Sequence, residues 1–250
     1  MSKIKIDYIF SAGFRCSSPD TLKMFGLRPF SGPFDYLFID IETVFKLMRE
    51  NMKSFMKDII VFNKLKQITY SIGSINELNK KHICYMAHDY NNINLRINTN
   101  FLDDRLSGNI YEWEKICIFH HHDICNKKQY DIISKRVDRF NKIIEKYSEK
   151  VCLFHITRIL TISDINEYMN NIIRLKLVYS INTYIVIIIC CDNLEDAYYF
   201  KEHILFIVKK VDPYTIQIST SGTDNNLNYE NELNIMKRFL NFELVKIDEI

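Results

Sequence analysis

Hydrophobic and polar positions along the chain follow two periods in turn, which predicts helices and strands in alternation. Over 129–150, apolar residues recur at every third or fourth position with charges between them, a spacing that predicts a long amphipathic helix. The unbroken apolar run at 184–191 instead predicts a strand buried on both faces of a sheet. A short β-rich run at 4–12 and the segment at 151–157 predict two further strands.

The remaining elements extend this alternation over the whole chain. Further helices are expected at 18–27, 40–56, 163–176, 195–209 and 229–240, and further strands at 59–62, 81–87, 114–120 and 215–219, with 91–110 irregular. Ser18 is the expected cap of the first helix, with Pro19 at its first position. Alternating strands and helices of these lengths indicate one α/β domain over 1–250, with a mostly parallel sheet flanked by helices in a three-layer, Rossmann-like arrangement.

Composition and charge exclude several classes of protein. The chain has 250 residues, 47% of them hydrophobic and 26% charged, as in an ordinary globular protein. Its 33 basic and 31 acidic residues give a net charge of +2, so no nucleic-acid partner is expected. The run at 184–191 is far shorter than the roughly 20 residues of a membrane helix, and we expect no membrane partner. Seven irregularly spaced cysteines without a CxxC pair indicate reduced thiols and a cytoplasmic location.

The end of the first strand carries the most specific motif. In parallel α/β sheets, ligands bind at the carboxyl ends of strands, which directs attention to SAGFRC at 11–16. A second motif, SGPFDY, follows at 31–36. Together they resemble a family of unknown function described as papain-like cysteine peptidases, with members in bacteria and large DNA viruses. Looser matches, HD at 88–89 and KRVDRF at 135–140, extend the resemblance over about 5–160.

The resemblance implies a cysteine nucleophile at Cys16 and a histidine partner at His88, on a peptide or small-molecule substrate. The residues themselves fit this chemistry, because a thiol just before a helix N-terminus has a lowered pKa and lies near backbone N–H groups that can form an oxyanion hole. Gly13 allows a substrate backbone to approach closely. Either Asp35 or Asp89 could orient the imidazole, and Asp35 is favoured if residue 89 is extended. The viral members extend the expected location to the cytoplasm of a host cell.

Other polar residues leave alternatives open. His121 or His122 could replace His88 as the general base. Adjacent histidines are only a weak signal for a metal site, because consecutive residues cannot all point at one ion. We therefore expect neither a metal nor a cofactor. Arg136 and Arg139, together with Arg15, are candidates to bind substrate through an anionic group. Asp35 is another candidate partner for Arg136 and Arg139. The simpler interpretation is that both arginines lie on a helix face exposed to solvent.

Three functions therefore compete at this stage. The first is a papain-like cysteine peptidase or a related cysteine-dependent hydrolase. The alternative is a glycosyltransferase-like or nucleotide-sugar-binding α/β protein, in which the arginines hold a phosphate and Cys16 is structural. The third is a non-enzymatic scaffold that binds a partner in the same pocket.

Overall fold

The computed structural model describes most of the two ends of the chain and short pieces of its middle. The described residues are 3–13, 17–37, 39–56, 59–62, 68–70, 82–84, 95–98, 118–119, 124, 126–158, 162–191, 194–211 and 229–245. Side chains are described over the same ranges except 59–119, 158 and 162–164.

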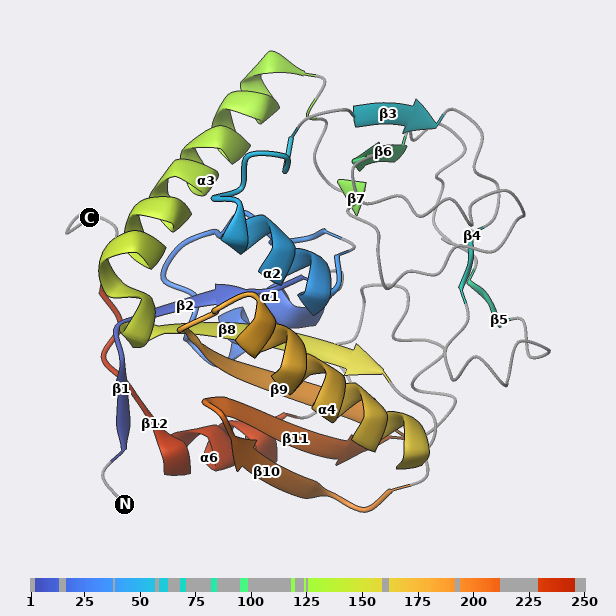
Figure 1. Cartoon of the computed structure of the whole chain (residues 1–250), viewed down its shortest axis with the longest axis vertical. Coiled ribbons are helices and arrows are strands. Elements are labelled where there is room, and N and C mark those ends of the chain that lie inside the picture. Colours follow the sequence, from blue (N-terminus) through green and yellow to red (C-terminus); the bar gives the residue numbers. More distant parts are fainter. Residues whose placement is uncertain are drawn as a thin grey trace.

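A five-stranded sheet in the order β10-β11-β9-β8-β2 forms the centre of the molecule (Figure 1). Its strands are β2 (Tyr8–Ser11), β8 (Val151–Arg158), β9 (Tyr184–Cys191), β10 (Ala197–Lys201) and β11 (Ile204–Lys210). All neighbours pair in parallel except β10, which runs antiparallel to β11 at one edge. The expected α/β class with a mostly parallel sheet is confirmed.

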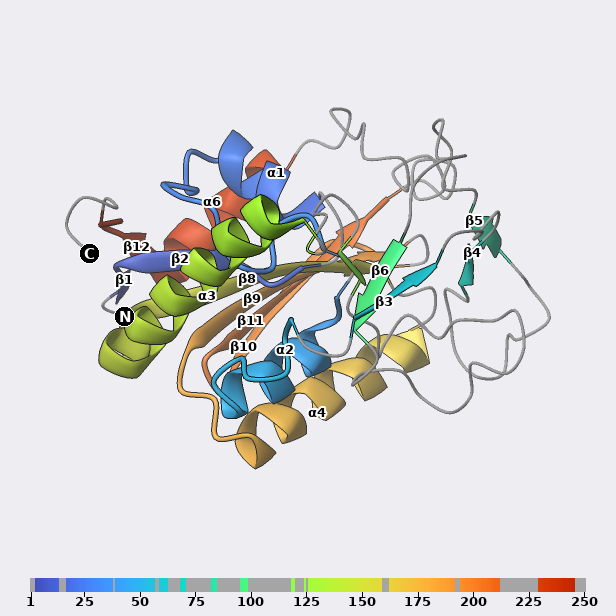
Figure 2. The same cartoon turned by 90° about the horizontal axis from the view of Figure 1, so that it is seen from above.

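Helices pack on both faces of this sheet, because the central strands are apolar on both faces. On one face lie α1 (Ser17–Met24) and α6 (Glu230–Phe239). On the other lie α2 (Ile41–Arg49), α3 (Lys127–Tyr147) and α4 (Ile162–Val178). In β9, Ile187 belongs to the core under α2, α3 and α4, and its neighbour Ile188 belongs to the core under α1 and α6. Figure 2 shows α1 and α6 on the opposite side of the sheet from α2 and α4.

The long amphipathic helix predicted at 129–150 is confirmed as α3. Asn126 caps it, since its side chain accepts a hydrogen bond from the backbone N–H of Lys128 at 3.0 Å. Its apolar stripe is buried against the sheet at Ile133, Val137, Phe140 and Ile143. A short 3₁₀ turn (Ser148–Lys150) then leads directly into β8.

The helix predicted at 195–209 is wrong, because this segment forms the hairpin β10–β11. The turn between the strands is made by Glu202 and His203, with φ of 50° and 62°. Two successive positive φ values are the backbone of a hairpin turn, which is normally marked by Asn or Gly. The β-branched and aromatic residues of β11 are fully buried in the sheet and override the helical spacing.

The short strands form smaller sheets. β1 (Ile4–Ile6) pairs in parallel with β12 (Leu240–Phe242), while β4 (Ile68–Tyr70) and β5 (His82–Cys84) pair with each other. A three-stranded antiparallel sheet contains β3 (Ile59–Phe62), β6 (Leu95–Asn98) and β7 (Ile118–Phe119), away from both termini in Figure 1.

Some of the other expected bounds need correction. The strand β6 falls inside 91–110, which we expected to be irregular. α2 ends at Arg49, earlier than the expected helix at 40–56, and Asp40 caps its start. The strand expected at 215–219 lies outside the described residues. Within the described ranges, no helix is both long enough and apolar enough to cross a bilayer.

Candidate functional site

The chain leaving β2 is attached to β8 on both sides of the predicted nucleophile segment. Before it, the backbone N–H of Ala12 donates to the carbonyl of Phe154 at 2.7 Å. After it, the Ser18 hydroxyl accepts a hydrogen bond from the Ile156 N–H at 3.1 Å and donates to the Gly13 carbonyl at 2.7 Å. The expectation that Ser18 caps the first helix is wrong: the residue lies inside α1, and its buried hydroxyl joins β2, α1 and β8 instead.

His155 lies on β8 at this junction and is only 2% exposed. Its Nδ1 is 3.1 Å from the carbonyl oxygen of Ala12. A carbonyl oxygen can only accept, so Nδ1 carries the proton and Nε2 is left with its lone pair. Burial lowers the pKa of His155 to about 4, and the hydrogen bond to Ala12 opposes this shift. The side chain is therefore a neutral imidazole of fixed tautomer at neutral pH.

Gly13 adopts a conformation that requires glycine. Its φ is +85°, and a Cβ built on it would overlap the side chain of Ile39 and lie 2.8 Å from the Ile39 carbonyl oxygen. The structure thus describes a close contact between Gly13 and Ile39. A contact between Gly13 and substrate stays a prediction.

Asp35, the acid of the second motif, is 1% exposed and holds its own loop together. Its Oδ2 accepts hydrogen bonds from Arg28 Nε at 3.1 Å, Arg28 Nη2 at 2.6 Å and the Gly32 N–H at 2.9 Å. Burial raises the pKa of Asp35, and the charge of Arg28 works against that rise. Its role in orienting a catalytic imidazole stays a prediction, but its place as the partner of Arg28 is clear.

Arg136 and Arg139 extend from α3 toward the same loop. Arg139 Nη2 donates to the Ser31 carbonyl at 2.6 Å, and its guanidinium lies 4.8 Å from the ring centre of Phe30. Burial lowers the pKa of both arginines, and the negative charge of Asp35 partly opposes this shift. We call Arg28, Arg136 and Arg139 around Asp35 the arginine cluster. The structure thus brings two candidate substrate-binding residues, Arg136 and Arg139, together with the candidate catalytic residue Asp35.

Other predicted site residues lie outside the described part of the chain. These are Arg15, Cys16, His88, Asp89, His121 and His122, whose catalytic and binding roles stay predictions. Sequence reasoning missed His155, although it interrupts the apolar residues at 151–156 of the strand. That interruption was the available signal, because a polar side chain in a buried strand needs a partner.

The fold and these contacts define an α/β protein whose polar residues gather where β2 ends beside β8. The chain belongs to the family described as "Putative papain-like cysteine peptidase (DUF1796)", whose model matches residues 7–193. This confirms the resemblance seen in the sequence and extends it beyond 160 to include β9. Searches of the curated proteins and of the solved structures gave no significant match.

Proposed function

We propose that this protein is a papain-like, cysteine-dependent hydrolase in which the thiol of Cys16 is the nucleophile. Family membership supports the class of reaction. The observation that carries the assignment is the hydrogen bond between Nδ1 of His155 and the Ala12 carbonyl, four residues before Cys16. It leaves Nε2 in the state that a general base needs.

Described contacts on both sides of the predicted nucleophile segment attach it to β8, the strand that carries His155. Ala12, before that segment, is hydrogen-bonded through its backbone N–H to the carbonyl of Phe154. Ser18 itself is hydrogen-bonded to Ile156, the residue after His155. A thiol and a base on neighbouring segments, with the base oriented by a third group, is the arrangement that nucleophilic cysteine catalysis uses.

In the proposed reaction, the Cys16 thiol gives its proton to Nε2 of His155, and the thiolate attacks the substrate acyl carbon. Backbone N–H groups at the start of α1 stabilise the oxyanion. The imidazolium then protonates the leaving group, which leaves an acyl group on Cys16. Water, deprotonated by the same imidazole, hydrolyses that thioester and restores the thiol. The base expected from the sequence, His88, with His121 and His122 behind it, is the competing assignment.

The test is hydrolysis of a peptide library and of p-nitrophenyl esters by the full chain and its variants. We expect Cys16→Ala to abolish turnover and His155→Asn to reduce it strongly, with Cys16 remaining acylatable by an activated ester. A strong loss in His88→Asn alone would move the base to His88. Full activity in Cys16→Ala would refute the hydrolase mechanism.

The arginine cluster also favours the second function, a protein that binds a sugar phosphate. That function predicts that Cys16→Ser leaves activity intact and that a sugar nucleotide is the donor. The same variant therefore separates the two functions, since a thiol nucleophile replaced by a hydroxyl loses most of its reactivity.

Two finer expectations belong to the same proposal. A three-layer, Rossmann-like arrangement within one domain is supported by helices on both sheet faces, with the parallel strands in the order β2-β8-β9-β11. A reducing, cytoplasmic compartment is supported by Cys152, Cys190 and Cys191, which are buried and form no disulfide.

A further inference from the structure

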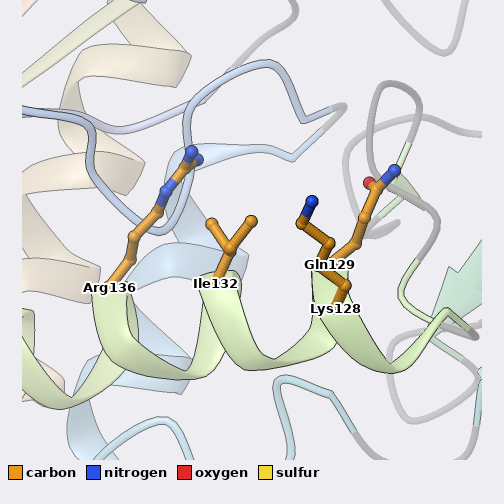
Figure 3. A pocket seen from close by; sticks show the side chains of 4 residues that line it. All are labelled: Lys128, Gln129, Ile132 and Arg136. Atoms are coloured by element: carbon orange, nitrogen blue, oxygen red, sulfur yellow. The ribbon is translucent and has the colours of Figure 1, made fainter.

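A pocket of about 290 Å³ lies along one side of α3. Lys128, Gln129, Ile132 and Arg136 line it, and Figure 3 shows all four side chains on the same side of the helix. Lys128, Ile132 and Arg136 are spaced four residues apart, which places them in one row along a helix. The lining therefore offers two cations, one amide and one aliphatic side chain that is 43% exposed.

The charges around this pocket are not balanced among the described side chains. The three guanidinium groups of the arginine cluster face two carboxylates: Asp35, whose Oδ2 is already bound to Arg28, and Asp20, whose charge also acts on Arg28. Arg136 Nη1 and Arg139 Nε are both buried and have no hydrogen-bond partner in the described part of the chain. Buried donors of a cation without a partner are costly, and an anion beside Arg136, the one of the two that lines the pocket, would offset the charge of its guanidinium.

The start of α3 adds to the same positive field. Its first turn holds Lys127 and Lys128 and no acidic residue. A helix N-terminus carries a partial positive charge, so acids are favoured there and lysines are disfavoured. Lys127 and Lys128 are therefore unfavourable next to the positive end of the helix dipole, and a bound anion would offset this repulsion.

From these observations, we propose that the pocket binds an oxyanion, the phosphate or carboxylate group of a small molecule or peptide. Arg136 supplies the paired N–H donors, Lys128 supplies the second positive charge, and Ile132 contacts the apolar part of the ligand. Arginine matches such groups because its planar fork of donors fits two oxygens at once. The site can be tested apart from the hydrolase proposal, because binding of a free anion needs no step at Cys16, although Arg136 is also a candidate to bind the hydrolase substrate.

Binding is tested by calorimetric titration of the full-length protein with inorganic phosphate and, separately, with succinate. Sodium chloride keeps the ionic strength constant, so general screening does not imitate binding. We expect saturable binding of at least one of the two anions, and the tighter one identifies the ligand as a phosphate or a carboxylate. Arg136→Gln should weaken binding about tenfold or more, the usual loss for a hydrogen bond to a charged group. Arg136→Lys should recover only part of it, because lysine lacks the fork.

Matched controls keep the test decisive. Arg174→Gln removes an exposed arginine of α4 that pairs with Asn171, and it should bind as the wild type does. Lys128→Gln changes an exposed side chain in the first turn of α3, so it should fold normally and bind about threefold more weakly. If neither anion binds saturably, or if Arg136→Gln and Lys128→Gln both bind as tightly as the wild type, the proposal is wrong.

Discussion

Nδ1 of His155 lies 3.1 Å from the carbonyl oxygen of Ala12, although the two residues are 143 positions apart in the chain. This contact joins the middle of β8 to the residue just after β2, the strand that precedes Cys16. It fixes the imidazole tautomer, and burial keeps the ring neutral. The hydrolase proposal depends on this pair, and the pair also affects stability.

The buried His155 should make the protein less stable in weak acid. Its pKa is about 4 in the folded state and near 6.5 when unfolded, so between these values only the unfolded chain takes up the proton. The contribution of neutral His155 to the free energy of unfolding is complete above pH 6.5 and falls as the pH drops toward 4. It amounts to roughly 3 kcal/mol in total. Urea unfolding at pH 7 and pH 4.5 measures the loss.

His155→Gln serves as the comparison, because an amide can still donate to Ala12 but does not titrate. Between pH 7 and pH 4.5, the free energy of unfolding of this variant should fall by about 2 kcal/mol less than that of the wild type. His203→Gln, at an exposed histidine of the β10–β11 turn, is the matched control for replacing a histidine by glutamine. An unchanged pH dependence in His155→Gln would contradict the assignment of a neutral, buried imidazole.

Gly13 and Gly26 provide a second test, since both have positive φ but only one is crowded. At Gly26, φ is +68° and nothing lies within 4 Å of an added Cβ, so Gly26→Ala should cost about 1–2 kcal/mol from backbone strain alone. At Gly13, the added Cβ also collides with Ile39. Gly13→Ala should therefore cost at least about 2 kcal/mol more, measured by chemical unfolding. Equal losses at the two positions would show that the Ile39 segment does not pack on Gly13.

The Arg28–Asp35 ion pair gives a third prediction. Arg28→Met leaves the carboxylate of Asp35, which is 1% exposed, without its cation and should cost roughly 3–5 kcal/mol of unfolding free energy at pH 7. Adding Asp35→Asn to that variant should recover part of the loss, because an amide needs no counter-charge. The two single variants and the double variant form a cycle. Additive losses in that cycle would mean that the two side chains do not interact energetically.

The sequence predicted the elements whose period is regular. α3 and β9 were found because one has a strict amphipathic spacing and the other an unbroken apolar run. The β10–β11 hairpin was missed because its turn, at Glu202 and His203, uses positive φ without the Asn or Gly that marks such turns. Its strands were mistaken for a helix because the spacing of their apolar residues also fits a helix.

The site was predictable only in part, for a related reason. Motif residues such as Gly13, Asp35 and Arg139 could be listed from local sequence, and their family was recognised correctly. The partner of His155 depends on the pairing of β2 with β8, which joins residues 143 positions apart. Likewise, the shortage of negative charge around Arg136 appears only when α3 packs beside the Asp35 loop.

The most direct test of the hydrolase proposal is the pH dependence of alkylation at Cys16. Iodoacetamide labelling of each of the seven cysteines is followed by mass spectrometry, in the wild type and in His155→Asn. The buried thiols of Cys152, Cys190 and Cys191 serve as slow internal standards. The proposal predicts that Cys16 reacts fastest, with a half-maximal rate at a pH below the usual thiol value of about 8.5 because of the helix N-terminus, and that His155→Asn slows its labelling at pH 7 because the base is lost. Equal labelling of all seven cysteines, or a rate of Cys16 labelling that His155→Asn leaves unchanged, would contradict it.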